Sequence, residues 1–441
     1  MRLRNKIMGA VLAVAVAGSG AGCEPEEENN NTGGEEVVAC DPAPGVICTF
    51  MGKGKAGLGH DGVSPREVLL YLPQDVSFGP DGRPYVLDWN NHRIRTVQDD
   101  KVITVLGTGE LGDAPKGKGP EISLNHPTHV AFDPAGNLIL SAWHNSKILR
   151  MNLSTLDVEP ICGTGGRDFG GDGGPAEMAI LDLPVATAFD SKGRMLIMDQ
   201  ANQRVRRVEE DGTIMTVVGP DKSYLPAGLV KVTFKDKDGN DATKVCKEEE
   251  AVDPQTCVAQ TPPKPQGFSG DGGDGSEAML YLPFSQSAPP AGRMEMGPGD
   301  RLFIADTGNQ RIRVWEPDGV IHTVAGSGPD TYDPKLAGAY AGDGGPATEA
   351  KFSRPVDVAV SSDGTLYIAD TDNHCIRKVD AKTQIITTFA GQCGKKGFDG
   401  DGQAATSALL YRPYGVALDK DENLYIADTH NHRIRVVYKS E

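Results

Sequence analysis

Apolar and polar positions follow one pattern that recurs through most of the chain. Its clearest copy is near the C-terminus, where residues 424–427 (Leu-Tyr-Ile-Ala) form a short apolar run of β-favouring residues. The polar residues 428–431 follow, and residues 433–437 (Arg-Ile-Arg-Val-Val) then alternate between polar and apolar side chains. An apolar run, a turn-forming segment and an alternating run are typical of a β-hairpin. The pattern therefore predicts two antiparallel strands joined by a tight turn.

Six copies of this hairpin are spread over the chain. Five carry an aspartate at the end of the first strand and an arginine seven residues later, whereas the copy at residues 138–150 has Ala142 and Leu149 in these places. A small four-stranded sheet cannot bury both faces unless neighbouring sheets stack on it, so the repeats predict an all-β, six-bladed β-propeller of four-stranded antiparallel blades. The five pairs are Asp88 and Arg95, Asp199 and Arg206, Asp306 and Arg313, Asp370 and Arg377, and Asp428 and Arg435.

The hairpin motif also resembles a known repeat. Residues 428–435, Asp-x-x-Asn-His-Arg-Ile-Arg, are similar to the Asn-His-Leu (NHL) repeat. The Gly-Asp-Gly-Gly-Pro-Ala segments before several blades resemble the NHL-type propellers of bacterial exported proteins and teneurins. The resemblance covers residues 46–441 and implies the same propeller fold. For function it implies two classes, because NHL-like propellers serve as binding platforms and, more rarely, as lyases or lactonases.

Both ends of the propeller region are incomplete. Residues 46–51 have the pattern of an outer strand but no inner strands before them, and the last blade stops after three strands. We expect residues 46–51 to pair antiparallel with residues 433–438 as the outer strand of that blade. Such closure would remove two open sheet edges.

Prolines mark the expected start of each inner strand, close to the channel at the propeller axis. Counting each proline as the first residue, the third residues are Asp75, His129, Ala186, Ser285, Asp357 and Gly415. Two carboxylates and one imidazole on a narrow ring can hold a divalent cation such as calcium or zinc, which makes Asp75, His129 and Asp357 the candidate binding and metal site. The alternative is that these positions are polar only because the channel is wet.

The linkers between blades share a further aspartate. It lies twelve residues before the strand-opening proline, in a segment that joins the outer strand of one blade to the inner strand of the next. The linker of the second blade lacks it and has Lys116-Gly-Lys118-Gly instead. The five linker aspartates are Asp61, Asp172, Asp271, Asp343 and Asp401.

The repeated hairpin aspartates permit two interpretations. They can form a ring of metal or ligand carboxylates, or each can form an ion pair with the arginine seven residues later. The copy that has Ala142 in place of the aspartate also has Leu149 in place of the arginine. This joint loss favours a partly buried, structural ion pair.

Six of the nine histidines fall into two groups. One group occupies a fixed position of the repeat, and we interpret it as turn or packing residues: His92, His374 and His432. The other group, His126, His129 and His144, lies in the second blade, which has lost its Asp–Arg pair. This coincidence is the best local indication of a functional site.

The N-terminal residues have the plan of an export signal, with a basic start, an apolar run over residues 7–17 and small residues before Cys23. We interpret residues 1–22 as a signal peptide and Cys23 as the acylated first residue of a lipoprotein, with ordinary signal-peptide cleavage as the alternative. Residues 23–45 are expected to be a flexible acidic tether. The sequence thus predicts an outer-membrane lipoprotein that faces the periplasm or the cell surface and meets the membrane only through its lipid.

Neighbouring cysteines of an exported protein are expected to form disulfides. The expected pairs are Cys40 with Cys48, Cys246 with Cys257, and Cys375 with Cys393, which leaves Cys162 over. The second pair lies in an insertion, residues 220–266, that we predict to be a loop with a role in specificity. Within it, residues 236–241 (Asp-x-Asp-Gly-Asn-Asp) have calcium-ligand chemistry but lack the glutamate that a helix-loop-helix calcium site places at its twelfth position.

Charge and motifs limit the function. A formal net charge of −17 makes nucleic acid a poor partner. The sequence has no Gly-x-Ser-x-Gly elbow, no phosphate-binding Gly-x-x-x-x-Gly-Lys loop and no His-Glu-x-x-His pair. We therefore favour a binding or scaffold module, without assigned catalytic residues, that presents its loop-bearing face to a protein or a cell-envelope glycan. The alternative is a metal-dependent lyase or lactonase, similar to amidating lyases and gluconolactonases, with its site at the channel.

Overall fold

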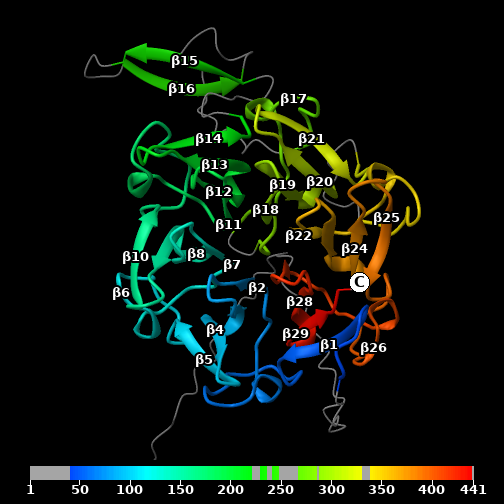
Figure 1. The fold of residues 1–441 in the computed structure, drawn as a ribbon. Coiled ribbons are helices and arrows are strands. Elements are labelled where there is room, and N and C mark those ends of the chain that lie inside the picture. Colours follow the sequence, from blue (N-terminus) through cyan, green and yellow to red (C-terminus); the bar gives the residue numbers. More distant parts are fainter. Residues whose placement is uncertain are drawn as a thin grey trace, which may run out of the picture. The chain divides into compact units, whose positions relative to one another are not determined.

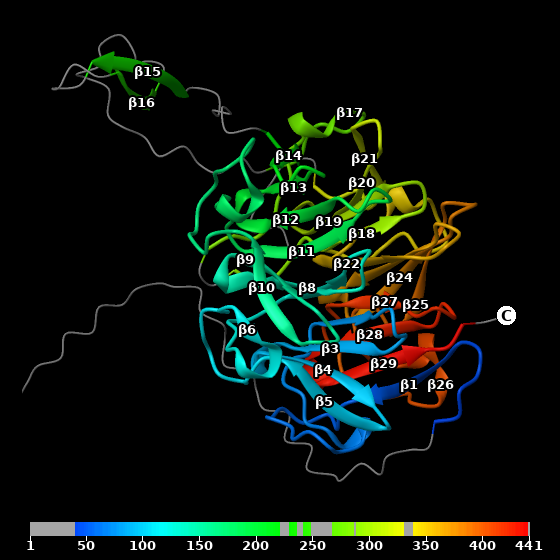
Figure 2. The same ribbon diagram turned by 60° about the vertical axis from the view of Figure 1, so that its left-hand side comes forward.

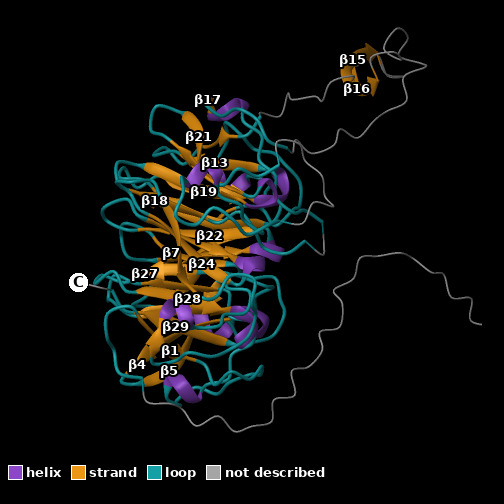
Figure 3. Ribbon diagram, turned by 90° about the vertical axis from the view of Figure 1, so that its right-hand side faces the viewer, coloured by secondary structure: helices purple, strands orange, loops and turns teal. Residues whose placement is uncertain are grey.

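The computed structural model describes residues 40–220, 229–235, 241–247, 267–285, 288–329 and 338–439. Within these ranges the chain forms six antiparallel sheets and one separate two-stranded sheet. The six sheets follow one another around an axis in sequence order and are the blades of a β-propeller (Figure 1). This confirms the fold class predicted from the hairpin repeats. Strands make up the body of the domain in each view, and helix is limited to short turns (Figures 2 and 3).

Each blade runs from an inner strand at the axis to an outer strand, and in blades two, four and six a two-residue strand of the linker adds to the outer edge. Blade one contains β2 (Asp75–Phe78), β3 (Pro84–Asp88), β4 (Arg93–Gln98) and β5 (Lys101–Leu106); blade two contains β7 (His129–Phe132), β8 (Leu138–Ala142), β9 (Lys147–Met151), β10 (Asp157–Cys162) and β6 (Gly117–Lys118). Blade three contains β11 (Pro184–Phe189), β12 (Met195–Asp199), β13 (Arg204–Val208) and β14 (Ile214–Val218); blade four contains β18 (Met294–Gly297), β19 (Arg301–Asp306), β20 (Arg311–Trp315), β21 (Val320–Ala325) and β17 (Gly273–Asp274). Blade five contains β22 (Pro355–Val360), β23 (Leu366–Asp370), β24 (Cys375–Val379) and β25 (Ile386–Ala390); blade six contains β27 (Val416–Leu418), β28 (Leu424–Asp428), β29 (Arg433–Val437), β1 (Val46–Met51) and β26 (Gln403–Ala404).

The ring closes where the two ends of the propeller meet. Strand β1 pairs antiparallel with β29, with Ile47 opposite Val437 and Thr49 opposite Arg435. The two strands lie side by side at opposite ends of the colour scale (Figure 1). Ile47 and Met51 are fully buried. The predicted pairing of residues 46–51 with the last strand is therefore confirmed.

Alternation along each strand builds the contacts between blades. Successive side chains of a strand point to opposite faces of the sheet. On β8, Leu140 packs in a cluster with Leu87 of blade one, whereas its neighbour Ile139 packs in a cluster with Ile197 of blade three. Each blade thus contributes both of its faces to apolar cores. Burial of each large apolar side chain stabilises the fold by about 1.5–3 kcal/mol.

The folded part extends beyond the predicted boundary of the tether. Cys40 forms a disulfide with Cys48, and the backbone N–H of Gly45 donates to the carbonyl oxygen of Tyr438 at 2.9 Å. Residues 40–45, which we assigned to the flexible tether, are therefore attached to blade six. Residues 1–39, with the predicted signal peptide and Cys23, lie outside the described residues.

The insertion contains strands where we predicted a loop. Strands β15 (Leu229–Lys235) and β16 (Asp241–Lys247) form a seven-pair antiparallel ladder. In β15, the apolar residues Val230, Val232 and Phe234 alternate with lysines and a threonine, which is the period of a strand. We missed this alternation in the sequence because the insertion as a whole is rich in charged residues. The possible calcium ligands at 236–240 lie outside the described residues.

Two of the three predicted disulfides are present. They are the pairs Cys40–Cys48 and Cys375–Cys393. Cys246 is disulfide-bonded, and its predicted partner Cys257 lies outside the described residues. Cys162 is a free thiol buried beside β9, and burial raises its pKa to about 12, so it is unreactive at neutral pH.

Candidate functional site

The repeated Asp–Arg pairs hold each blade to its linker. In blade one the guanidinium of Arg95 lies 3.6 Å from Asp88 and 2.9 Å from the linker aspartate Asp61, which also accepts hydrogen bonds from Thr104 of the outer strand. The arginine and the hairpin aspartate are fully buried in all five copies, so both charges are used within the fold. The equivalent triads are Asp199–Arg206–Asp172, Asp306–Arg313–Asp271, Asp370–Arg377–Asp343 and Asp428–Arg435–Asp401.

Blade two has lost every member of this network together. Pro115, Ala142, Leu149 and Pro160 stand where the other blades have the linker aspartate, the hairpin aspartate, the arginine and the outer-strand threonine. Loss of a single member would leave a buried charge unpaired and destabilise the fold by about 3–5 kcal/mol. Joint loss leaves no unpaired charge. Ala142 and Leu149 instead pack in the apolar core shared with blade one.

A histidine or glutamine in the turns of five blades fastens one blade to the next, whereas the turn of blade two has Ser146 at this position. Nδ1 of His432 accepts a hydrogen bond, at 3.1 Å, from the backbone N–H of Leu72, which precedes the inner strand of blade one. Imidazole accepts at Nδ1 only in its neutral form, and burial lowers the pKa of His432 to about 4. The other four contacts join His92 to His126, Gln203 to Leu282, Gln310 to Arg354 and His374 to Arg412.

The three residues predicted as the channel site lie close to one arginine. Nη1 of Arg293 is 3.2 Å from Asp75 and 3.3 Å from Asp357. The same guanidinium donates to the carbonyl oxygens of Gln74, at 2.7 Å, and Thr128, at 2.6 Å. Arg293 therefore extends from blade four across the channel to blades one and two.

The predicted residues also pair with inner strands. An inner strand is the free edge of its blade, so its outward N–H groups need acceptors. Oδ2 of Asp75 accepts the N–H of Val130 in blade two at 2.8 Å. The equivalent contacts join Asp357 to Val416, at 3.0 Å, and His129 to Thr187, at 3.4 Å. Each of the three side chains thus links its own blade to the next.

Arg293 is the central residue that sequence reasoning missed. We predicted Ser285 at this level of blade four because it follows Pro283, and the structure corrects this. Asp306 lies 23 residues after Pro283, whereas the distance from the proline to the equivalent position is 15 in the other five blades. Blade four thus has extra residues before its inner strand. Counting back from Asp306 rather than forward from Pro283 would have found Arg293.

Burial controls the charges around Arg293. It raises the pKa of Asp75 to about 6 and lowers that of His129 to about 3. Glu295 lies on β18, two residues after Arg293, and its side chain is accessible to solvent within the ring of inner strands. Burial, together with the charges of Asp357 and Asp75, raises its pKa to about 8. A cation at Asp75, His129 and Asp357 would have to displace the guanidinium. In the described ranges, no three or more His, Cys, Asp and Glu side chains are grouped in a way suited to a metal ion.

A row of aromatic rings lies on the face that carries the hairpin turns, here called the turn face. It is formed by Trp89, His126, His144 and Trp143, with ring-centroid distances of 4.8, 5.1 and 4.2 Å between successive members. Trp89 and His144 belong to η2 (Trp89–Asn91) and η4 (Trp143–Asn145), the turns of blades one and two. Nε1 of Trp89 and Nε2 of His144 have no hydrogen-bond partner. Of the three blade-two histidines, the structure places two in this row and the third, His129, at the channel.

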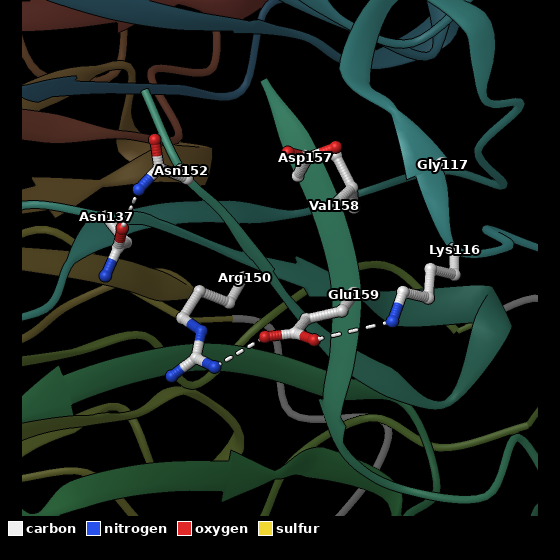
Figure 4. Close-up of a pocket in the computed structure, with 8 residues that line it drawn as sticks. All are labelled: Lys116, Gly117, Asn137, Arg150, Asn152, Asp157, Val158 and Glu159. Atoms are coloured by element: carbon white, nitrogen blue, oxygen red, sulfur yellow. Dashed lines mark hydrogen bonds and ion pairs between the residues drawn. The ribbon is translucent and has the colours of Figure 1, made fainter. Parts of the chain in front are cut away.

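Among the cavities of the described part of the chain, one lies on the turn face and one lies at blade two. One, of about 240 Å³, opens on the turn face between blades four and five. Its lining residues are Pro283, Thr307, Gly308, Gln310, Gly338, Ser353, Arg354 and Asp372. The other, of about 450 Å³, lies over the outer strands of blade two. Figure 4 shows Glu159 in this second cavity between Arg150 and Lys116, so its charges are paired with one another.

No helix in the described part of the chain has both the length and the apolar character needed to cross a membrane.

Comparison with known proteins gives one family for most of the chain. The family model described as Teneurin NHL domain matches residues 44–230, 285–380 and 316–397, and the NHL repeat model matches residues 410–437. Teneurin-1 of Homo sapiens is 28% identical over 80% of this chain, and NHL repeat-containing protein 2 of Homo sapiens is 26% identical over 80% of it. The chain spans only 14% and 44% of the lengths of these two relatives.

Solved structures share the fold. The crystal structure of an auxiliary nutrient binding protein from Bacteroides ovatus superposes with a TM-score of 0.53, over 90% of this chain and 77% of that one. Its sequence identity to this chain is 15%, so the likeness concerns the propeller architecture alone.

Proposed function

Because the chain belongs to the Teneurin NHL domain family, we propose that it is an exported, lipid-anchored module that binds a protein or a cell-envelope glycan through its turn face. The family and the fold support a binding-type propeller. Its partner, its location and the face that it uses are the parts that we add.

The cysteines support export and anchoring. Disulfides persist in oxidising compartments, and the pairs Cys40–Cys48 and Cys375–Cys393 agree with such a location. Small residues precede Cys23, as in a lipoprotein signal. In this proposal the lipid on Cys23 holds the propeller at the outer membrane, on the periplasmic or the outer side.

The observation that carries the proposed face is the ring row. Aromatic side chains combine a large apolar surface with a polar tip, and they are enriched where proteins bind partners. Buried polar groups nearly always have a hydrogen-bond partner, so Nε1 of Trp89 and Nε2 of His144, which have none among the described residues, are exceptions. Both atoms are enclosed in the free protein, so a bound partner would satisfy them by reorienting the rings. The row lies at blade two, the blade without the Asp–Arg network.

A double variant, Trp89→Phe with His144→Phe, tests this face. It retains an aromatic ring at both positions but removes both unpaired polar groups. Each lost hydrogen bond is expected to weaken binding by about 0.5–1.5 kcal/mol. The assay measures how much soluble Cys23→Ser protein is retained on isolated cell envelopes. The envelopes are tested untreated, after protease treatment and after periodate treatment. Loss of retention after protease indicates a protein partner, and loss after periodate indicates a glycan.

The control is Lys420→Ala on the opposite face, where Lys420 is exposed and pairs only with the neighbouring Asp421. It should bind as the parent protein does. Equal retention of the parent and the double variant would reject the turn face as the binding surface. Wild-type protein that fractionates as soluble would reject the lipid anchor.

A further inference from the structure

Among the described residues, no carboxylate lies closer than 3.9 Å to Arg354 on the turn face. Each of the five repeat arginines has a carboxylate oxygen within 2.9 Å. The side chain of Arg354, only 14% exposed, lies 3.9 Å from Asp372 and donates to the carbonyl oxygen of Pro290 at 3.4 Å. Its Nε has no hydrogen-bond partner within the part of the chain that the structure describes. A guanidinium has five N–H donors in a planar fork, so most of the hydrogen-bonding capacity of Arg354 is unused.

The nearby carboxylate is committed to a second arginine. Asp372 accepts a hydrogen bond from Nε of Arg412 at 3.0 Å, closer than its contact with Arg354. Two guanidinium groups therefore share one carboxylate, which leaves a positive charge. Arg412 and Arg354 help to lower the pKa of His430 to about 3, after the larger effect of burial. This part of the surface is locally positive in a chain whose net charge is −17.

The 240 Å³ cavity lies directly at Arg354. Gln310 accepts the backbone N–H of Arg354 through Oε1, and within the described residues its Nε2 has no acceptor. The hydroxyl of Ser353 is likewise without a partner there. The ring of Tyr414 lies 5.2 Å from the guanidinium and holds it in place. The cavity thus combines one underused cation with neutral donors.

We propose that this cavity binds the carboxylate of an acidic saccharide, with Arg354 as the group that recognises it. A planar carboxylate matches the fork of a guanidinium, and a bidentate pair of this kind is among the strongest hydrogen-bonded contacts in proteins. Gln310 and Ser353 suit the hydroxyl groups of the sugar ring. The inference rests on the proposed binding function and selects a glycan as its partner.

The compact shape of the cavity favours a sugar over an acidic peptide. Its volume of about 240 Å³ lies just below the range of about 300–1,000 Å³ of ordinary small-molecule sites, and it suits one ring rather than an extended chain.

Titration of the propeller with trigalacturonate, and separately with triglutamate, tests the proposal by calorimetry. We expect trigalacturonate to bind and Arg354→Gln to weaken its binding about tenfold or more, as expected for loss of a charge-assisted pair. Asp372→Asn should strengthen binding, because it removes the carboxylate that competes for Arg354. Arg301→Gln is the matched control, since Arg301 pairs with Glu316 on blade four and does not line the cavity.

Opposite effects of the two substitutions cannot arise from unfolding, which would weaken binding in both. Preferential binding of triglutamate would reject the saccharide in favour of a protein partner. No binding of either probe, or equal binding by Arg354→Gln and the parent, would reject the site. The turn-face proposal would survive that result if envelope retention still depended on Trp89 and His144.

Discussion

Removal of β1 should destabilise the whole propeller, because this strand completes blade six. A chain that begins at Lys53 lacks the residues that pair with β29 and β26. It loses the burial of Ile47 and Met51, both fully enclosed, at about 1.5–3 kcal/mol each. It also loses the hydrogen bond of Thr49 to Asp401, at 2.5 Å, and exposes the edge of β29.

The sum of the two apolar terms, about 3–6 kcal/mol, is a large part of the 5–15 kcal/mol by which domains are usually stable. We therefore expect the chain that begins at Lys53 to melt at a much lower temperature or to aggregate, in differential scanning calorimetry. A chain that begins at Glu36 keeps β1 and the Cys40–Cys48 disulfide and is the control. It should melt as the full-length protein does. Equal melting temperatures for the two shortened chains would refute the closure argument.

Three further predictions concern residues within the fold. Arg293→Met should lower the free energy of unfolding, measured by urea denaturation, by about 3–5 kcal/mol, because Asp75 and Asp357 stay buried without their cation. Adding Asp75→Asn with Asp357→Asn should restore part of this loss. An unchanged urea midpoint would contradict the stabilising role of Arg293 at the channel. His432→Gln should match the wild type at pH 7, because Gln203 and Gln310 make the same contact in their blades. The folded pKa of His432, about 4, lies below the unfolded value of about 6.5, so its stabilisation is present above pH 6.5 and lost as pH falls towards 4. Between pH 6.5 and pH 4, the stability of the variant relative to the wild type should therefore rise by up to about 1.4 kcal/mol for each unit by which the pH falls. If the unfolding free energies of the two proteins change with pH in parallel, His432 does not accept this hydrogen bond. Asp343→Asn should destabilise blade five, because Arg377 would keep only the more distant carboxylate of Asp370. Hydrogen exchange of β24 and β25 should therefore become faster. Asp363→Asn, at an exposed turn, is the control and should leave the exchange rates unchanged.

The fold could be predicted because its signals are local. The hairpin motif repeats in full, and two incomplete ends, residues 46–51 and the last blade, indicate closure without any structural information. The linker aspartates were also visible as a pattern. Their partners were not, because Asp61 and Arg95 meet across 34 positions and sequence spacing does not show which side chain reaches which arginine.

The candidate site was only partly accessible to sequence reasoning. The sequence indicates that equivalent positions of three inner strands are held by Asp75, His129 and Asp357, and the structure has them there. The cation between the two aspartates is Arg293 of blade four. Extra residues between Pro283 and the inner strand of that blade hid its position from the sequence pattern. Arg354 could not be singled out, because its significance lies in hydrogen bonds that it does not make. The ring row depends on the contact between His126 and Trp89, from different blades, which only the folded chain brings together.

Site-specific photo-crosslinking tests the central claim, that the turn face is the binding surface, most directly. A benzophenone side chain at position 90, beside Trp89 in η2, should give a defined adduct in intact cells, and the same group at position 421, on the opposite face, should give none. Sensitivity of the adduct to periodate or to protease would identify it as glycan or protein. An adduct from position 421 alone, or none from either position, would contradict the account.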